Sequence, residues 1–192
     1  MPKPSLRDAL LDAGFEQLYA GGYAATGVAT IAAAANAPKG SFYNHFRSKE
    51  ALAVEVLGRY GQGRRLELLG EPGVSAVQRI RNHLDHMRDD LAEHGYRRGC
   101  MFGNFAAEAP TGAPEVTALV SAALSRWRSL LAAAIGDGQR AGDIADDVDP
   151  DSAAQIIIDA WEGAAMRAKV IGASTPIDNV NDLVFSRILS VR

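Results

Sequence analysis

The chain contains a single cysteine, Cys100, and few aromatic residues, which make up 7% of its 192 positions. One thiol cannot form an intrachain disulfide, and it cannot supply the several thiolates of a cysteine-rich zinc cluster. Runs of β-branched residues are also scarce, since the longest covers residues 156–158. The sequence therefore predicts neither a small disulfide-stabilised module nor a β-sheet protein.

Long apolar segments are missing as well. No stretch approaches the roughly 20 apolar residues of a membrane span, and the first residues lack the apolar core of a signal peptide. Hydrophobic residues make up 47% and charged residues 22% of the chain, with a net charge of −3. These values are typical of a folded, soluble protein. We expect a cytoplasmic protein without a membrane partner, whose overall charge does not attract nucleic acid.

Apolar residues recur at helical spacing along the chain, which predicts an all-α fold. The first helix is expected over residues 6–20, with Ser5 as its N-cap. Thr26 is expected to cap a short second helix, whereas Pro38 and Ser48 are expected to begin the third and fourth. Further helices are expected near residues 75–93, 99–109, 114–135, 151–171 and 177–190.

Acidic residues are absent from residues 26–49, although the chain as a whole is acidic. A helix in the major groove needs donors that reach bases, surrounded by cations and hydroxyls that hold phosphates. A solvated basic face on an ordinary helical hairpin would have a similar composition. The residues of the suitable types are Lys39, Ser41, Tyr43, Asn44, His45 and Lys49.

A longer pattern surrounds this segment, including the stretches Gly22-Tyr23-Ala24-Ala25-Thr26 and Lys39-Gly40-Ser41-Phe42-Tyr43-Asn44-His45-Phe46-Arg47. Residues 10–52 as a whole resemble the N-terminal domain of the TetR family of repressors. The resemblance implies a helix-turn-helix over residues 27–44, and it implies that Thr26, Tyr43, His45 and Lys49 lie near phosphates. The recognition helix would run from Pro38 to Asn44 and include Gly40, with Phe42 and Phe46 in the core.

The turn of this helix-turn-helix departs from the family at one position. Asn36 stands where the family usually has a glycine. Asparagine is among the few residues that tolerate a left-handed backbone. We therefore expect the turn to be preserved.

The resemblance also implies a division of labour along the chain. Residues 1–52 would form the DNA-binding domain, and residues 53–192 an all-helical body for effector binding and dimerisation. The implied function is that of a homodimeric transcriptional repressor, which binds double-stranded operator DNA and is released by a small-molecule effector. An activator, or a DNA-binding protein without effector control, remains an alternative.

An enzyme is not expected, because the sequence shows no nucleophile with a placed base and no nucleotide-binding loop. We therefore expect no catalytic residue, no cofactor and no metal. His83 and His86 are spaced for one helix face, but solvated histidines are the simpler expectation.

The stretch from Arg97 to Glu108 is the most distinctive part of the body. It resembles a branch of the family that includes repressors of electrophile and acrylate detoxification genes. Cys100 follows two arginines at an expected helix start, a positive setting that stabilises a thiolate. An inert, buried cysteine is the alternative.

Other candidates for the effector site come from several predicted helices. Lys169 lies in an apolar stretch, where a lysine either extends outward to solvent or meets a partner, and Cys100 or the effector is the candidate partner. Each of the remaining candidates could equally be an ordinary core residue. They are Phe102, Asn104, Phe105, Trp127, Trp161 and Met166.

Overall fold

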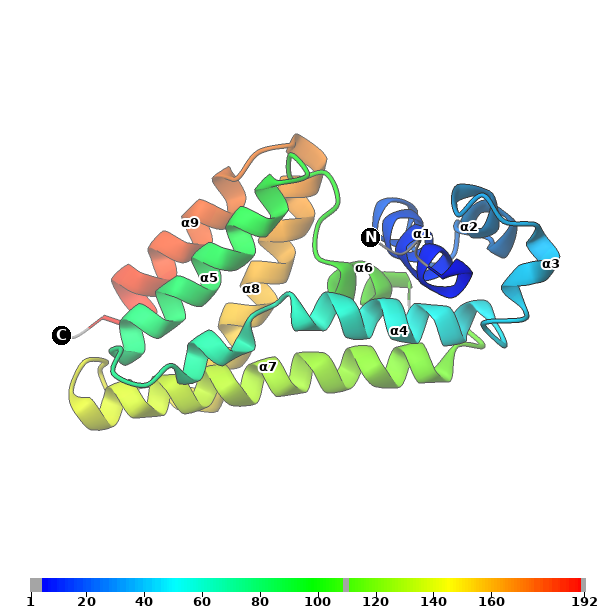
Figure 1. Ribbon diagram of the computed structural model, residues 1–192. Coiled ribbons are helices and arrows are strands. Elements are labelled where there is room, and N and C mark those ends of the chain that lie inside the picture. Colours follow the sequence, from blue (N-terminus) through cyan, green and yellow to red (C-terminus); the bar gives the residue numbers. More distant parts are fainter. Residues whose placement is uncertain (1–4, 109–110, 191–192) are drawn as a thin grey trace. The chain divides into compact units, whose positions relative to one another are not determined.

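The computed structural model describes residues 5–108 and 111–190, and its regular elements are all helices (Figure 1). The prediction of an all-α fold is therefore confirmed. In chain order the elements are α1 (Leu6–Gly21), α2 (Val28–Ala34), α3 (Lys39–Phe42), α4 (Lys49–Gln62), the 3-10 helix η1 (Leu66–Gly70), α5 (Ala76–Ala92), α6 (Met101–Glu108), α7 (Pro114–Ala141), α8 (Pro150–Ile171), α9 (Thr175–Leu183) and the π-helical turn η2 (Val184–Ile188).

The helices form two compact units. Unit 1 comprises Met1–Gly61 and Met101–Ala122, and unit 2 comprises Gln62–Cys100 and Ala123–Arg192. The boundary predicted after residue 52 would fall inside α4, where Leu52 and Val56 are both fully buried. The first segment of unit 1 therefore ends at Gly61, later than the predicted boundary. The division of function between residues 1–52 and 53–192 stays a prediction.

Polar side chains fix the first turns of several helices. The Ser5 hydroxyl accepts a hydrogen bond from the Asp8 backbone N–H at 3.2 Å. The Ser48 hydroxyl likewise accepts from the Ala51 N–H at 3.0 Å. Such caps satisfy donors that have no partner within the helix. Both predicted helix starts are confirmed.

Thr26 does not have the capping role that the sequence predicted. The N-cap of α2 is Gly27, which makes no side-chain capping bond. The Thr26 hydroxyl instead donates to the Gln17 carbonyl at 3.1 Å, and Thr26 is only 5% exposed. A buried hydroxyl needs such an internal acceptor. This hydrogen bond ties the start of α2 to α1.

α7 continues to Ala141, beyond the end predicted near residue 135. The helix continues through Gly138, where the missing side chain leaves room for neighbouring residues to pack against the helix. A Cβ there would lie 2.5 Å from Ile144 Cδ1 and 3.0 Å from Ala76 Cβ. The helix ends before Gly142, whose φ of +79° is left-handed.

α7 also corrects the expectation that no segment could cross a membrane. Within residues 5–108 and 111–190, it is the one helix long and apolar enough to do so by length and composition. Trp127 and Leu131 of α7 are nevertheless buried in unit 2. Length and composition alone do not distinguish a core helix from a membrane span.

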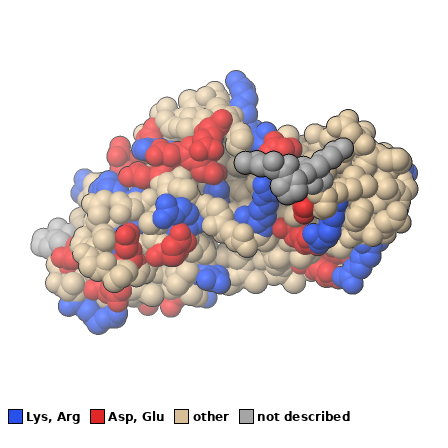
Figure 2. Space-filling view, viewed as in Figure 1, with Lys and Arg blue, Asp and Glu red and all other residues tan. Residues whose placement is uncertain are grey.

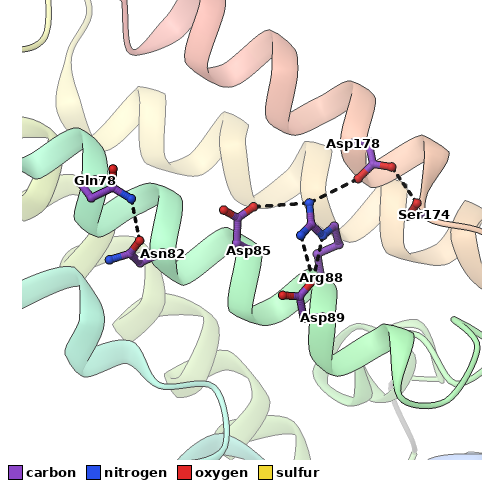
Figure 3. Close-up of polar contacts among 7 residues, drawn as sticks. All are labelled: Gln78, Asn82, Asp85, Arg88, Asp89, Ser174 and Asp178. Atoms are coloured by element: carbon purple, nitrogen blue, oxygen red, sulfur yellow. Dashed lines mark hydrogen bonds and ion pairs between the residues drawn. The ribbon is translucent and has the colours of Figure 1, made fainter.

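Unit 2 is held together by polar as well as apolar contacts. Arg88 of α5 contacts Asp89 at 2.9 Å and reaches Asp178 of α9 at 3.8 Å (Figure 3). Asp178 in turn accepts from the Ser174 hydroxyl at 2.7 Å. α8 packs directly against α9.

In Figure 2, acidic and basic side chains are interspersed over most of the visible face, consistent with the small net charge.

Gly14 of α1 allows a close approach to α4 within unit 1. A Cβ at Gly14 would lie 2.5 Å from a Leu52 methyl group, and Leu52 is fully buried. We expect overpacking in Gly14→Ala to cost about 2 to 3 kcal/mol, because Leu52 is fully buried. Since alanine gains roughly 1 kcal/mol over glycine in a helix, the free energy of unfolding should fall by about 1 to 2 kcal/mol. Urea unfolding measures the change.

Gly58 of α4 provides the matched control. A Cβ at this position meets no atom within 4 Å, so Gly58→Ala retains the helix-forming benefit without a clash. We expect it to raise the free energy of unfolding by about 0.5 to 1 kcal/mol. If the two substitutions changed stability in the same direction, the close approach at Gly14 would not control packing.

Candidate DNA-binding surface and effector site

α2 and α3 meet at a tight turn centred on Asn36. Asn36 has a φ of +53°, so the predicted left-handed backbone is confirmed. The Ala37 N–H donates to the Ala32 carbonyl at 2.9 Å, which closes the turn. Phe42 and Phe46 are buried with their ring centroids 5.6 Å apart, as predicted. These contacts fix α3 on the core of unit 1.

α3 ends at Phe42, before the end predicted at Asn44, and most of the predicted DNA-contacting residues on it and in the turn that follows are exposed. Lys39, Gly40, Asn44 and His45 are exposed, and the Tyr43 side chain is 56% exposed although the residue is aromatic. Tyr43 is the C-cap of α3 and keeps a helical backbone, with φ −71° and ψ −10°, so it lies one turn beyond Lys39 on a similar side. An exposed aromatic phenol beside cationic and amide donors suits contact with phosphates and base edges.

Three other predicted contacts have partners within unit 1. The Ser41 hydroxyl donates to the Pro38 carbonyl at 2.6 Å, and Thr26 is bonded as described above. The Lys49 ammonium group donates to the Tyr23 carbonyl at 2.9 Å and lies 4.1 Å from the centroid of the Tyr23 ring. Lys49 thus has a structural role within unit 1, while phosphate contact by its side chain and by Thr26 stays a prediction.

The turn between α1 and α2 is held by Glu108 at the end of α6. Its carboxylate accepts hydrogen bonds from the backbone N–H groups of Tyr23, at 3.1 Å, and Ala24. Gly22 has a φ of +80°, and a Cβ there would lie 2.1 Å from the Glu108 Oε1. Sequence reasoning gave Glu108 no role, because 84 residues separate it from Ala24.

The predicted effector residues divide between the two units. Phe102 and Phe105 belong to unit 1, where their rings make edge contacts with Tyr60 at 5.2 Å and Tyr23 at 5.7 Å. Asn104 is half-buried on the same helix, α6. These two phenylalanines therefore pack in the core of unit 1.

An aromatic cluster occupies the interior of unit 2. The Trp127 ring makes edge contacts with Trp161 and with His83, each at 5.7 Å between centroids. All three residues are buried. Both indole N–H groups are buried without a hydrogen-bond partner among the described residues. Such donors are costly to bury, so they are suited to a polar ligand atom or a water molecule.

His83 corrects the expectation of solvated histidines. Its side chain is fully buried, and burial lowers its pKa to about 4, with further lowering by the charges of His86 and Arg64. The imidazole is therefore neutral at physiological pH. The described residues contain no group of three or more His, Cys, Asp or Glu side chains arranged to hold a metal ion.

Met166 also lies elsewhere than predicted. It is 62% exposed on α8, whereas Trp161 of the same helix is fully buried. The two side chains point in different directions because they are five residues apart on a helix with 3.6 residues per turn. Lys169 is half-buried on α8. Met166 therefore belongs to the outer face of α8 and not to the buried aromatic cluster.

Cys100 lies immediately before α6 and is 4% exposed. Its predicted setting was positive, from Arg97 and Arg98. The structure adds an acidic neighbour that the sequence reading missed, because the Cys100 side chain is hydrogen-bonded to the Glu162 carboxyl group. Burial raises the pKa of Glu162 to about 7, although the Cys100 hydrogen bond and the Arg64 charge oppose this shift.

Comparison with known families supports the helix-turn-helix. Residues 10–56 match a family model described as bacterial regulatory proteins of the tetR family, and residues 76–184 match a tetracyclin repressor-like C-terminal domain. The chain belongs to the TetR family. It is therefore a DNA-binding transcriptional regulator, and the family membership predicted from residues 10–52 is confirmed.

Individual relatives of this TetR-family regulator align along most of its length. The HTH-type transcriptional repressor DhaR of Mycobacterium sp. strain GP1 is 31% identical, with 98% of this chain and 95% of DhaR covered. The transcriptional regulator AcuR of Cereibacter sphaeroides is 34% identical, with coverages of 88% and 79%. The crystal structure of the reduced form of Escherichia coli NemR superimposes with a TM-score of 0.85 at 26% identity, covering 98% of this chain and 99% of NemR.

Lys39 and Tyr43 provide the test of the exposed α3 surface. Replacing either with alanine should weaken operator binding by about 1 to 3 kcal/mol while leaving the thermal unfolding temperature unchanged, because both side chains point outward. Fluorescence anisotropy over a salt series measures both effects. Lys39→Ala should also reduce the slope of log affinity against log salt by about 1 if the ammonium contacts a phosphate.

Tyr43→Phe is the matched control for the tyrosine, because it keeps the ring and removes only the hydroxyl. Retained affinity in Tyr43→Phe together with loss in Tyr43→Ala would assign the contact to the ring. Parental binding by both alanine variants would contradict the placement of α3 on DNA.

Proposed function

We propose that this regulator is a homodimeric repressor that works in the cytoplasm and leaves its operator when a small molecule binds or modifies the helical body near Cys100. The observation that carries the proposal is the α2–α3 pair, in which the tight turn at Asn36 and the buried Phe42 leave Lys39 and Tyr43 exposed. Two such units in a dimer would read half-sites about 34 Å apart or a multiple of that distance. The relatives named as repressors support this direction of regulation.

The proposed dimer interface lies on the outer face of α8 and on α9. Large apolar side chains rarely remain exposed together on a monomeric protein. The exposed positions here are Ile156 (57%), Met166 (62%), Val170 (77%), Ile171 (55%) and Leu183 (57%). The inner face of α8 is occupied within unit 2, since Ile157, Trp161 and Ala168 are fully buried. α8 therefore has one face for its own core and one for a second copy.

Val170→Glu should convert the dimer into a monomer, because a buried carboxylate facing an apolar partner surface is costly. Analytical ultracentrifugation at micromolar concentration would show the change in mass, and operator affinity should fall with it. Ala92→Glu, at an exposed position on α5, is the control that adds the same charge elsewhere. A Val170→Glu protein that sediments with the parental mass would place the dimer interface elsewhere.

The effector is proposed to act at Cys100 together with the buried groups of unit 2. Candidate contacts within unit 2 are Cys100, Trp127, Trp161 and Lys169, whereas an effector role for Phe102, Asn104 and Phe105 of unit 1 stays a prediction from the sequence. A carbon electrophile such as an unsaturated acid or aldehyde would be attacked by the thiol sulfur. Release requires the modified or bound protein to favour the state that does not bind DNA.

Cys100→Ser tests whether the thiol is the sensor. We expect the variant to bind the operator with parental affinity, since Cys100 is remote in sequence from α3, and to lose release by electrophiles. A gel-shift assay with a reactive unsaturated aldehyde, compared with its saturated analogue, measures this. Unchanged release of Cys100→Ser by the reactive compound would exclude a covalent sensor at this residue.

A further inference from the structure

Glu162 of α8 is an acidic side chain that the fold places against a thiol. The Cys100 side chain is hydrogen-bonded to its carboxyl group, while its Oε1 atom is buried without a hydrogen-bond partner among the described residues. Both residues belong to unit 2. A buried carboxyl group with an unused oxygen costs stability that a glutamine or an apolar residue would not. Ionisable groups whose pKa is shifted by burial and a specific neighbour cluster at functional sites.

Burial makes Glu162 hold its proton more tightly than an ordinary carboxyl group, and a nearby cation only partly opposes this effect. Arg64 is the cation that acts on it, but Arg64 is only 5% exposed and forms an ion pair with Asp90 of α5 at 2.7 Å. His83, which also senses the Arg64 charge, is neutral at this pH. The cation whose charge opposes the shift is thus also paired with Asp90, and burial raises the pKa of Glu162 to about 7.

We propose that Glu162 is the general base for Cys100, which accepts the thiol proton as the sulfur attacks a carbon electrophile. The inference rests on the reactive cysteine of the proposed function and assigns the residue that makes it reactive. An unassisted thiol is mostly protonated at neutral pH, since its ordinary pKa is about 8.5. A base that exchanges its proton near neutral pH is the most effective kind for this task.

The proposed step is balanced without an oxidant. With an alkene conjugated to a carbonyl, the sulfur bonds to the β-carbon and the π electrons move toward the α-carbon and the carbonyl oxygen. The thiol proton passes to Glu162 and is then returned to the α-carbon, so the product is a thioether formed by net addition. With iodoacetamide, the C–S bond forms as the C–I bond breaks, iodide leaves, and the proton passes through Glu162 to water.

The single cysteine makes the test direct, because every alkylated thiol is Cys100. Rates of iodoacetamide addition to the full-length protein are measured by mass spectrometry between pH 5.5 and 9. In the parent the rate should rise through an inflection near pH 7 and reach a plateau before the ordinary thiol ionisation. Glu162→Gln keeps a hydrogen-bond acceptor but cannot take the proton, so it should lose this inflection and react at least about tenfold more slowly at pH 7.5.

Three comparisons make the outcome decisive. Glu93→Gln, an exposed acid at the end of α5, should react like the parent. Glu162→Asp should keep the inflection with a reduced rate, and it is the variant to read if Glu162→Gln does not fold. The urea-unfolded parent defines the profile of an unassisted thiol. A folded parent with that same profile, or a Glu162→Gln variant as fast as the parent or faster, would overturn the proposal.

The same samples separate this inference from the proposed function. Operator release is followed in parallel with alkylation. Glu162-dependent alkylation without release would exclude the sensor and leave the general base intact. Release by a reagent whose reaction shows no dependence on Glu162 would exclude the general base and leave the sensor intact.

Discussion

The geometry of unit 1 depends on two hydrogen bonds from a backbone turn to one carboxylate. Glu108 accepts from the N–H groups of Tyr23 and Ala24, directly before the α2–α3 pair. Hydrogen bonds to an ionised acceptor are about twice as strong as neutral ones. The N–H groups of this turn thereby gain an acceptor from α6, and the entry to α2 is fixed. The segment that starts next to Cys100 thus ends on the turn that positions the DNA-binding helices.

The interior of unit 2 contains polar groups that its described residues do not satisfy. In unit 1 the buried hydroxyl of Thr26 and the half-buried ammonium group of Lys49 have partners, and they stabilise the turns around α2. In unit 2 the indoles of Trp127 and Trp161 bury N–H groups that have no partner among the described residues. A protein keeps such groups at a cost in folding stability.

Much of the fold was predictable from local signals. Ser5 and Ser48 could be identified as caps and Asn36 as a left-handed turn, because each acts on residues within three or four positions of itself. Gly138 misled the prediction, since its effect depends on Ile144 and Ala76 packing against it. The sequence also suggested an end to α7 that tertiary packing overrides.

The site was predictable only where it is formed by consecutive residues. The exposed residues on α3 and in the turn that follows it agree with the pattern over residues 39–45, and the structure presents Lys39 and Tyr43 on the surface. Glu162 could not be found, because its partner Cys100 is 62 positions away and an acidic residue on a helix is usually solvated. Met166 was misplaced because an apolar residue on an amphipathic helix suits the core and an interface equally well.

The lone thiol determines how long a signal would last. A sensor with a second cysteine can be reset by reductants, because exchange reactions attack a disulfide. Cys100 has no second thiol in its chain, and its adduct with a carbon electrophile would be a thioether, which thiol exchange does not cleave. Recovery of repression would then follow the lifetime of the adduct and the synthesis of new protein. The duration of the response would be set by growth and turnover, independent of the redox state of the cell.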